Sequence, residues 1–151
     1  MCIPSIYQDE LGAVWLGTTE GLNRYNGKDV RVFQPSESNH GLTNNEINEL
    51  CGDKNGRMYI RSGNDLIKLD IYTEQFTCLR QKGVYGLFCK KDTLWVSCAD
   101  GIYYYTGQGT ELTFFARVQK GFVGRALYVD RETVWVVTRK YLVAISREDP
   151  L

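Results

Sequence analysis

Apolar residues recur at matching positions in four segments of the chain, each built around one large aromatic residue. These aromatic residues are Trp15, Tyr59, Trp95 and Trp135, and they lie 44, 36 and 40 residues apart. In every segment the residues one and seven positions after the aromatic residue are aliphatic, and the tenth is large and apolar. Agreement at so many positions without a gap indicates an internal repeat.

The pattern within each repeat predicts β-strands. An apolar stretch leads into a turn, which reads D-x-x-G at 9–12 and 53–56 and is one residue shorter through 91–92 and 131–132. A strand through the aromatic residue follows, then, in the first three repeats, a turn that contains Gly or Asn; a third strand follows in every repeat. Gly and Asn suit hairpin turns because they tolerate positive φ. A fourth strand is expected in the first three repeats, at 30–33, 75–79 and 112–116.

These repeats predict an all-β fold of β-propeller blades. A spacing of 36 to 44 residues matches a four-stranded blade and is too long for a leucine-rich repeat. We place four units in a single domain, at about 1–43, 44–82, 83–122 and 123–151. The last unit is incomplete because no segment follows for its outermost strand, so we expect a fragment or half-ring of a larger propeller.

Composition excludes several classes of protein. The chain has 151 residues, of which 18 are Lys or Arg and 18 are Asp or Glu. This balance argues against disorder, and it leaves no electrostatic footprint for nucleic acid or anionic lipid. The longest apolar stretches are strand-sized, far short of the roughly 18 to 20 residues that a membrane span needs. The first residues contain neither a basic segment nor an apolar core, so no secretory signal is visible in this chain.

Cysteine and histidine spacing gives no metal or cofactor site. The cysteines are Cys2, Cys51, Cys78, Cys89 and Cys98. They form no C-x-x-C pair, and the single histidine, His40, has no cysteine close by, so we expect no zinc site and no cofactor. We interpret the cysteines as small buried residues in strands and leave their redox state open.

The first repeat resembles the two-component regulator propeller repeat. The family pattern reads D-x-x-G-x-[LI]-W-[IL]-G-T-x-x-G-L-x-[RK]-[YF], and residues 9–25 match it closely through Asp9, Gly12, Trp15 and Gly21. The second repeat matches in part, with Tyr59 in place of the tryptophan. The third and fourth repeats each keep only the aromatic residue and one aliphatic position of the family pattern, and the third also keeps a glycine.

This resemblance implies a role in signalling. Propellers of that family form the extracytoplasmic sensor region of hybrid two-component systems, common in Bacteroidetes, that detect oligosaccharides. It therefore implies a periplasmic, non-catalytic sensor module, part of a membrane-anchored protein, whose ligand is an oligosaccharide or other small molecule. Kinase, receiver and DNA-binding parts would lie in chain that is not present here, and no contact with nucleic acid or membrane is expected through this chain.

Residues that occupy one position in several repeats are interpreted as structural. Trp15, Trp95 and Trp135 are expected to pack between neighbouring blades rather than stack on sugars. Asp9 and Asp53 are expected to close β-turns through hydrogen bonds to the backbone.

Function is expected where the repeats differ. In a propeller, the loops between blades and those between the second and third strands open on one face around the axis. Amide, aromatic and charged groups at these positions suit hydroxyl-rich or anionic sugars. The candidate ligand-binding residues are Glu20, His40, Asn44, Asn45, Asn64, Tyr85, Asp100, Arg125, Arg139 and Lys140.

Two other functions remain as alternatives. The same residues would suit a protein partner, as in a generic protein-binding propeller. A sialidase-like enzyme is disfavoured, because the Asp-to-Gly spacing is one residue longer than in an Asp-box and no catalytic constellation is found. An open half-ring also predicts either a homodimer or contacts to further propeller blades.

Overall fold

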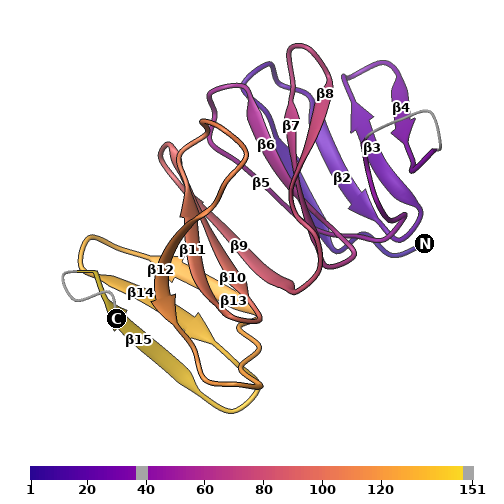
Figure 1. Cartoon of the computed structure of the whole chain (residues 1–151). Helices are drawn as coiled ribbons and strands as arrows, with labels where there is room; N and C mark the ends of the chain where they lie inside the picture. Colours follow the sequence, from indigo (N-terminus) through magenta and orange to yellow (C-terminus); the bar gives the residue numbers. More distant parts are fainter. Residues whose placement is uncertain (37–40, 148–151) are drawn as a thin grey trace.

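The computed structural model describes residues 1–36 and 41–147 and contains only strands and connecting turns within them (Figure 1). The strands form four antiparallel sheets, here called blades 1 to 4 in chain order. Blade 1 contains β1 (Ser5–Gln8), β2 (Val14–Thr18), β3 (Gly21–Tyr25) and β4 (Val30–Phe33). Blade 2 contains β5 (Ile47–Gly52), β6 (Arg57–Ser62), β7 (Asp65–Asp70) and β8 (Gln75–Arg80).

The other two blades continue this order. Blade 3 contains β9 (Val84–Lys90), β10 (Thr93–Cys98), β11 (Gly101–Tyr105) and β12 (Thr113–Arg117). Blade 4 contains β13 (Ala126–Val129), β14 (Thr133–Val137) and β15 (Leu142–Ser146). Within each blade, neighbouring strands in the sequence are neighbours in the sheet. The prediction of an all-β fold built from propeller blades is therefore confirmed.

The blades follow one another side by side from the N-terminal to the C-terminal end of the molecule (Figure 1). Their first strands, β1, β5, β9 and β13, contact one another in succession and form one edge of the stack. Direct bonds join them: Ser5 Oγ on β1 accepts a hydrogen bond from the Leu50 amide on β5 at 2.9 Å. The Lys90 ammonium on β9 donates to the Val129 carbonyl on β13 at 2.9 Å.

Apolar side chains fill the space between each pair of neighbouring blades. Trp15 and Leu22 of blade 1 pack with Ile47 and Met58 of blade 2, and all four are almost fully buried. Tyr59 of blade 2 is buried with the apolar residues of blade 3. Trp95 of blade 3 and Val134 of blade 4 are buried together in the core between these two blades. There are thus three cores, each between two sheets.

The aromatic residues of the first three repeats pack toward the next blade, as predicted for Trp15 and Trp95. The prediction is wrong for Trp135, which belongs to none of the three inter-blade cores. Trp135 is only partly buried. Because Val134 and Val136 pack against blade 3, strand alternation directs Trp135 to the opposite face of blade 4.

Asp9 holds the turn between β1 and β2 in the way the sequence predicts. One carboxylate oxygen accepts hydrogen bonds from the amides of Leu11 at 2.9 Å and Ala13 at 3.0 Å. The other accepts a hydrogen bond from the Trp15 indole at 2.8 Å. The repeated aspartate therefore joins the turn to the side chain at the centre of the inter-blade core.

Blade 2 replaces this indole bond with a guanidinium bond. Asp53 accepts hydrogen bonds from the amides of Asn55 at 2.8 Å and Arg57 at 3.3 Å, which confirms its predicted turn role. Tyr59 stands where the tryptophan would be, and the Arg57 side chain donates to the free Asp53 oxygen at 2.5 Å. The aspartate thus keeps a side-chain donor although the aromatic residue has changed.

Blade 4 contains a third aspartate of this kind, Asp130, which the sequence pattern did not reveal. Its carboxylate accepts hydrogen bonds from the amides of Glu132 at 2.9 Å and Thr133 at 2.8 Å, and from the Trp135 indole at 3.1 Å. These hydrogen bonds lower the pKa of Asp130, and the bond from the Glu132 amide has the largest effect. The turn is one residue shorter than in blade 1, so the D-x-x-G spacing is lost while the hydrogen bonds remain.

The prediction that the cysteines are buried is wrong for two of the five. Cys98 is buried and Cys51 and Cys89 are half-buried, but Cys2 and Cys78 are exposed. Cys2 precedes the first strand, and Cys78 lies on β8, an outer strand.

Within the described residues, no group of three or more His, Cys, Asp or Glu side chains is placed to hold a metal ion. No described helix is long and apolar enough to span a membrane.

Replacing Asp9 with alanine is expected to destabilise the chain by about 2–4 kcal/mol, because two amides and a buried indole lose their acceptor. Asp9→Asn, which keeps one acceptor, should cost less. Asp29→Ala, at an exposed turn position, should change stability by no more than about 0.5 kcal/mol. Urea midpoints provide the measurement, and an Asp9→Ala midpoint equal to the wild-type value would contradict the role of this bond.

The faces at the two ends of the stack expose apolar side chains. On blade 1, Ile6 (67% exposed) and Val30 (61%) lie on the face opposite Trp15. On blade 4, Tyr128 (57%) and Leu142 (65%) share a face with Trp135.

Such faces favour association, and the expected homodimer or contact with further blades stays a prediction. Light scattering coupled to size exclusion checks the homodimer. A species of twice the 17.3 kDa chain mass is expected above micromolar concentration. A monodisperse species at the mass of one chain would exclude the homodimer.

Candidate functional site

Two sets of loops lie on one side of the stack, here called the loop face. They are the turns between the second and third strands and the connections between successive blades. Hydrogen bonds join the two sets: the Val84 amide donates to the Asn64 carbonyl at 3.0 Å, and the Ala99 amide to the Gly83 carbonyl at 2.8 Å. This is the face on which the sequence places the ligand-binding residues.

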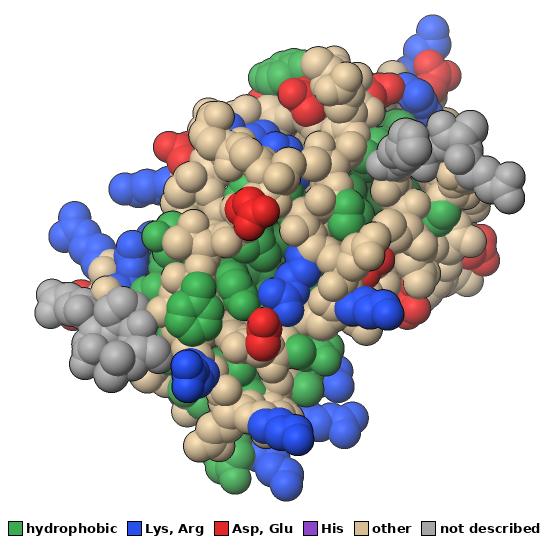
Figure 2. Space-filling model, viewed as in Figure 1, with side chains coloured by type: hydrophobic (Ala, Val, Ile, Leu, Met, Phe, Trp, Pro, Cys, Tyr) green, Lys and Arg blue, Asp and Glu red, His purple; other side chains and the backbone are tan. Residues whose placement is uncertain are grey.

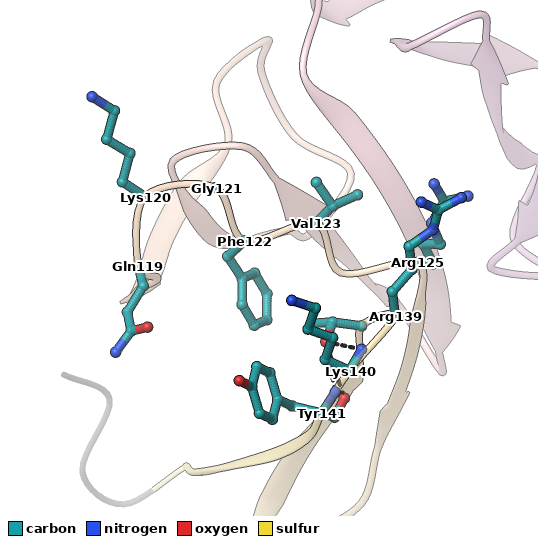
Figure 3. A pocket seen from close by; sticks show the side chains of 10 residues that line it. Gln119, Lys120, Gly121, Phe122, Val123, Arg125, Arg139, Lys140 and Tyr141 are labelled. Carbon is teal, nitrogen blue, oxygen red and sulfur yellow. Dashed lines mark hydrogen bonds between the residues drawn. The ribbon is translucent and has the colours of Figure 1, made fainter.

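The loop face is hollowed at blade 4, and this hollow is the candidate site. It has a volume of about 440 Å³ and lies between the β12–β13 connection (residues 118–125) and the β14–β15 turn (residues 138–141). Figure 3 shows its lining, in which Phe122 and Tyr141 project toward the middle and Lys120 projects away. The lining residues are Gln119, Lys120, Gly121, Phe122, Val123, Arg125, Thr138, Arg139, Lys140 and Tyr141.

Thr138 shapes the β14–β15 side of this site. Its hydroxyl oxygen accepts hydrogen bonds from the amides of Lys140 at 3.2 Å and Tyr141 at 2.9 Å. Its own amide donates to the Tyr141 carbonyl at 2.9 Å, which closes the turn. The turn therefore leaves the side chains of Arg139 and Lys140 exposed at its tip.

The β12–β13 side is a longer connection that folds back on itself. The Phe122 amide donates to the Gln119 carbonyl at 3.0 Å, and Gly121 between them has a φ of +83°, which glycine adopts without strain. At the far end, the Arg125 amide donates to the Val137 carbonyl of β14 at 2.9 Å. That bond fixes the connection beside the turn and completes the hollow.

The charge of the site is positive. Four of its lining residues are Lys or Arg, and none is Asp or Glu. Figure 2 shows blue Lys and Arg side chains gathered at the lower end of the molecule, where blade 4 lies. A concave surface of one sign attracts ligands of the opposite charge, and guanidinium groups bind carboxylate, sulfate or phosphate oxygens through paired hydrogen bonds. Phe122 and Tyr141 add apolar surface between the charges.

A second hollow of about 610 Å³ adjoins the first along β15. Its lining is mainly apolar and includes Val118, Val143 and Ile145. Phe122 and Tyr141 contribute to both hollows, so the two form one continuous depression. A ligand with an anionic group at the loop face has adjacent apolar surface to cover.

The structure brings three of the predicted residues together here, namely Arg125, Arg139 and Lys140. The predicted residue Asp100 is already engaged elsewhere: it accepts bonds from the Arg80 guanidinium at 2.7 Å and the Tyr103 hydroxyl at 2.9 Å. Burial opposes ionisation, but the Tyr103 bond and the Arg80 charge outweigh it and lower the pKa of Asp100.

Three of the remaining predicted residues accept hydrogen bonds within the loops, one through its side chain and two through the backbone. The Asn44 side-chain oxygen accepts a hydrogen bond from the Glu46 amide at 2.9 Å. Glu20 and Asn64 contribute carbonyl oxygens, the first to the Gln34 side chain and the second to the Val84 amide. These groups stabilise loops and lie outside the lining of the hollow.

Three predicted residues remain. Tyr85 is half-buried on β9, and Asn45 is exposed in the connection that leads to β5. His40 lies outside the described residues. Neither Tyr85 nor Asn45 is among the residues that line the hollow.

Sequence analysis missed Gln119, Lys120, Phe122 and Tyr141. One signal was available for the first three, because the β12–β13 connection is longer than the β8–β9 connection at residues 81–83. Length alone would not have selected this connection, because the β4–β5 connection at residues 34–46 is longer still. Tyr141 directly follows two predicted residues, but its place in the turn gave no reason to select it.

Comparison with known proteins identifies the fold. No protein-family model matches the chain, and no curated protein matches it. Among solved structures, the extracellular domain of the hybrid two-component system BT3049 from B. thetaiotaomicron has a TM-score of 0.81 at 20% identity, over 98% of this chain and 24% of that one. The extracellular domain of BT4673, a one-component system from the same organism, has a TM-score of 0.79 at 18% identity, over 99% and 24%.

A designed protein has a similar arrangement and a similar length. The computationally designed Ika4 protein has a TM-score of 0.66 at 13% identity, over 96% of this chain and 91% of that one. In contrast, this chain spans only about a quarter of the two B. thetaiotaomicron domains, 24% in each case. At these identities the likeness shows the fold, which is an arc of blades like those in both domains.

Proposed function

We propose that this chain is a ligand-binding sensor module, located in the periplasm, of a two-component signalling protein. Two independent features support the proposal. The first repeat resembles the two-component regulator propeller repeat, and the fold matches extracellular domains of B. thetaiotaomicron signalling systems over nearly the whole chain. Signal output then belongs to other parts of that protein.

The observation that carries a binding role is the positively charged hollow on blade 4. It lies on the loop face, it joins an apolar depression, and its cations come from two separate chain segments. Arg139 and Lys140 are exposed, so an incoming ligand reaches their side chains from solvent. We propose that the ligand is an oligosaccharide with acidic groups, whose carboxylates or sulfates bind the cations while a sugar ring covers Phe122 or Tyr141.

The same residues support binding rather than catalysis. Glycoside hydrolysis generally needs a pair of carboxylates on either side of the bond that breaks. The described lining of the hollow contains no carboxylate and no histidine. We therefore propose a module that is not an enzyme and that releases its ligand unchanged.

Acidic oligosaccharides are expected to raise the melting temperature of the chain by several degrees at saturating concentration, because a ligand that binds only the folded state stabilises it. Neutral oligosaccharides of equal length should have a smaller effect. The double variant Arg139→Ala/Lys140→Ala should bind at least about tenfold more weakly, since charge-assisted hydrogen bonds are lost. Thermal shift and calorimetric titration provide the measurements, and added salt should weaken binding.

Lys28→Ala is the matched control, because Lys28 is an exposed cation on a turn between the third and fourth strands of blade 1. It should bind like the wild type. The proposed site is wrong if acidic oligosaccharides bind the double variant and the wild type equally. The proposed ligand class is wrong if neither acidic nor neutral oligosaccharides shift the melting temperature.

A protein-binding propeller remains the second candidate function. The apolar end faces with Ile6 and Leu142 favour it, because exposed patches of this kind mark contacts between proteins. Under this alternative, substitutions at the end faces would abolish binding of a partner while Arg139→Ala would not.

A further inference from the structure

Two cysteines meet where the first strands of blades 2 and 3 lie side by side. The sulfur atoms of Cys51 on β5 and Cys89 on β9 are 2.9 Å apart. Both residues are half-buried and both are free thiols. In the described part of the chain, this is the one pair of cysteine sulfurs in hydrogen-bond contact.

A second contact between the same strands holds the two thiols in place. The carboxylate of Glu49, two residues before Cys51, accepts a hydrogen bond from the amide of Leu87 at 3.1 Å. Leu87 is in turn two residues before Cys89. The Arg61 guanidinium, on the neighbouring strand β6, also donates to this carboxylate at 3.3 Å. The two strands therefore keep one fixed alignment, in which both cysteines point at each other.

The other contacts between first strands use different chemistry at similar positions. Between blades 1 and 2, the ring of Tyr7 lies against Gly52, where a Cβ would come within 2.1 Å of the tyrosine hydroxyl. Between blades 3 and 4, the rings of Phe88 and Tyr128 meet edge to face with centroids 5.4 Å apart. Each of the three pairs of neighbouring first strands thus meets through different side chains. Of these three pairs, only the one between blades 2 and 3 brings together two atoms that are able to form a covalent bond.

We propose that Cys51 and Cys89 form a disulfide bond that joins blades 2 and 3 in an oxidising compartment. The reaction is thiol–disulfide exchange with an external disulfide, such as oxidised glutathione or the active-site disulfide of a thiol oxidoreductase. One thiolate attacks the external disulfide and releases a thiol, and the second cysteine then displaces the other thiol. Two protein thiols are oxidised, one external disulfide is reduced to two thiols, and both protons pass to these products.

Surrounding groups set the rate of this reaction. Burial, the neighbouring Cys89 and the carboxylates of Glu49 and Asp53 raise the pKa of Cys51 well above its ordinary value. The hydroxyls of Tyr7 and Tyr59 also interact electrostatically with Cys89. Because the thiolate is the attacking species, closure of the bond is expected to be slow at neutral pH and faster as the pH rises.

The bond would stabilise the stack of blades. It closes a loop that contains the rest of blade 2 and most of the first strand of blade 3, and so restricts the unfolded chain. It also prevents these two blades from separating.

The test is to incubate the folded chain with oxidised glutathione, alkylate it under denaturing conditions and measure its mass. We expect three alkylated cysteines instead of five, and a peptide pair that contains Cys51 and Cys89. The oxidised chain should melt roughly 5–12 °C higher than the reduced chain. Addition of a dithiol reductant should reverse the shift.

Three variants complete the design. Cys51→Ser and Cys89→Ser should each leave four alkylated cysteines and remove the shift, and circular dichroism confirms that they fold. Cys78→Ser, at an exposed cysteine, is the control: it should form the bond and show the same melting shift as the wild type, with two alkylated cysteines after oxidation. The proposal is overturned if folded wild-type chain retains five alkylated cysteines at pH 8.5 after prolonged oxidation. It is equally overturned if the bond that forms joins any other pair.

Discussion

Apolar packing between neighbouring sheets is the interaction on which the rest of this structure depends. A four-stranded sheet has two faces, and one blade cannot cover its own apolar side chains. Each of the three inter-blade cores is filled from both sides, with Trp15, Tyr59 or Trp95 near its centre. The repeated aspartate supports this packing, because in blade 1 it binds the indole and the turn together. The turns, the order of the blades and the loop face all follow from how the sheets stack.

Much of this fold could be predicted from sequence because its determinants are periodic. The aromatic positions and their aliphatic neighbours occupy one register in every repeat, so a single pattern predicts the strands and the sides they bury. Asp130 escaped this reasoning because its turn lacks the glycine and is one residue shorter, although its hydrogen bonds match those of Asp9. The aspartate makes the same hydrogen bonds in the shorter turn, whereas a sequence pattern with fixed spacing no longer matches it. The exposure of Cys78 was also missed, since its position on an outer strand is a tertiary property.

The candidate site was less predictable, because it lies where the repeats differ. Sequence selected Arg139 and Lys140 from their place in a turn, and the structure places both in the hollow. Phe122 was missed because its position depends on how residues 118–125 fold back. The Phe122 amide donates to the Gln119 carbonyl, and the Arg125 amide donates to Val137 of β14. Asp100 was selected for its place in a turn, but Arg80 and Tyr103 already bind its carboxylate. Local sequence shows which loops carry polar groups; partners from other strands decide which of these groups remain available.

Amide hydrogen exchange tests most directly the claim that packing between blades holds the molecule together. Blades 2 and 3 are covered on both faces, whereas blades 1 and 4 are each covered on one. At a concentration where the chain is monomeric, the slowest exchange is expected in β6, β7 and β10, and faster exchange in β3 and β14. Equal or slower exchange in β3 and β14 would contradict the account, because it would mean that each sheet is stable without its neighbours.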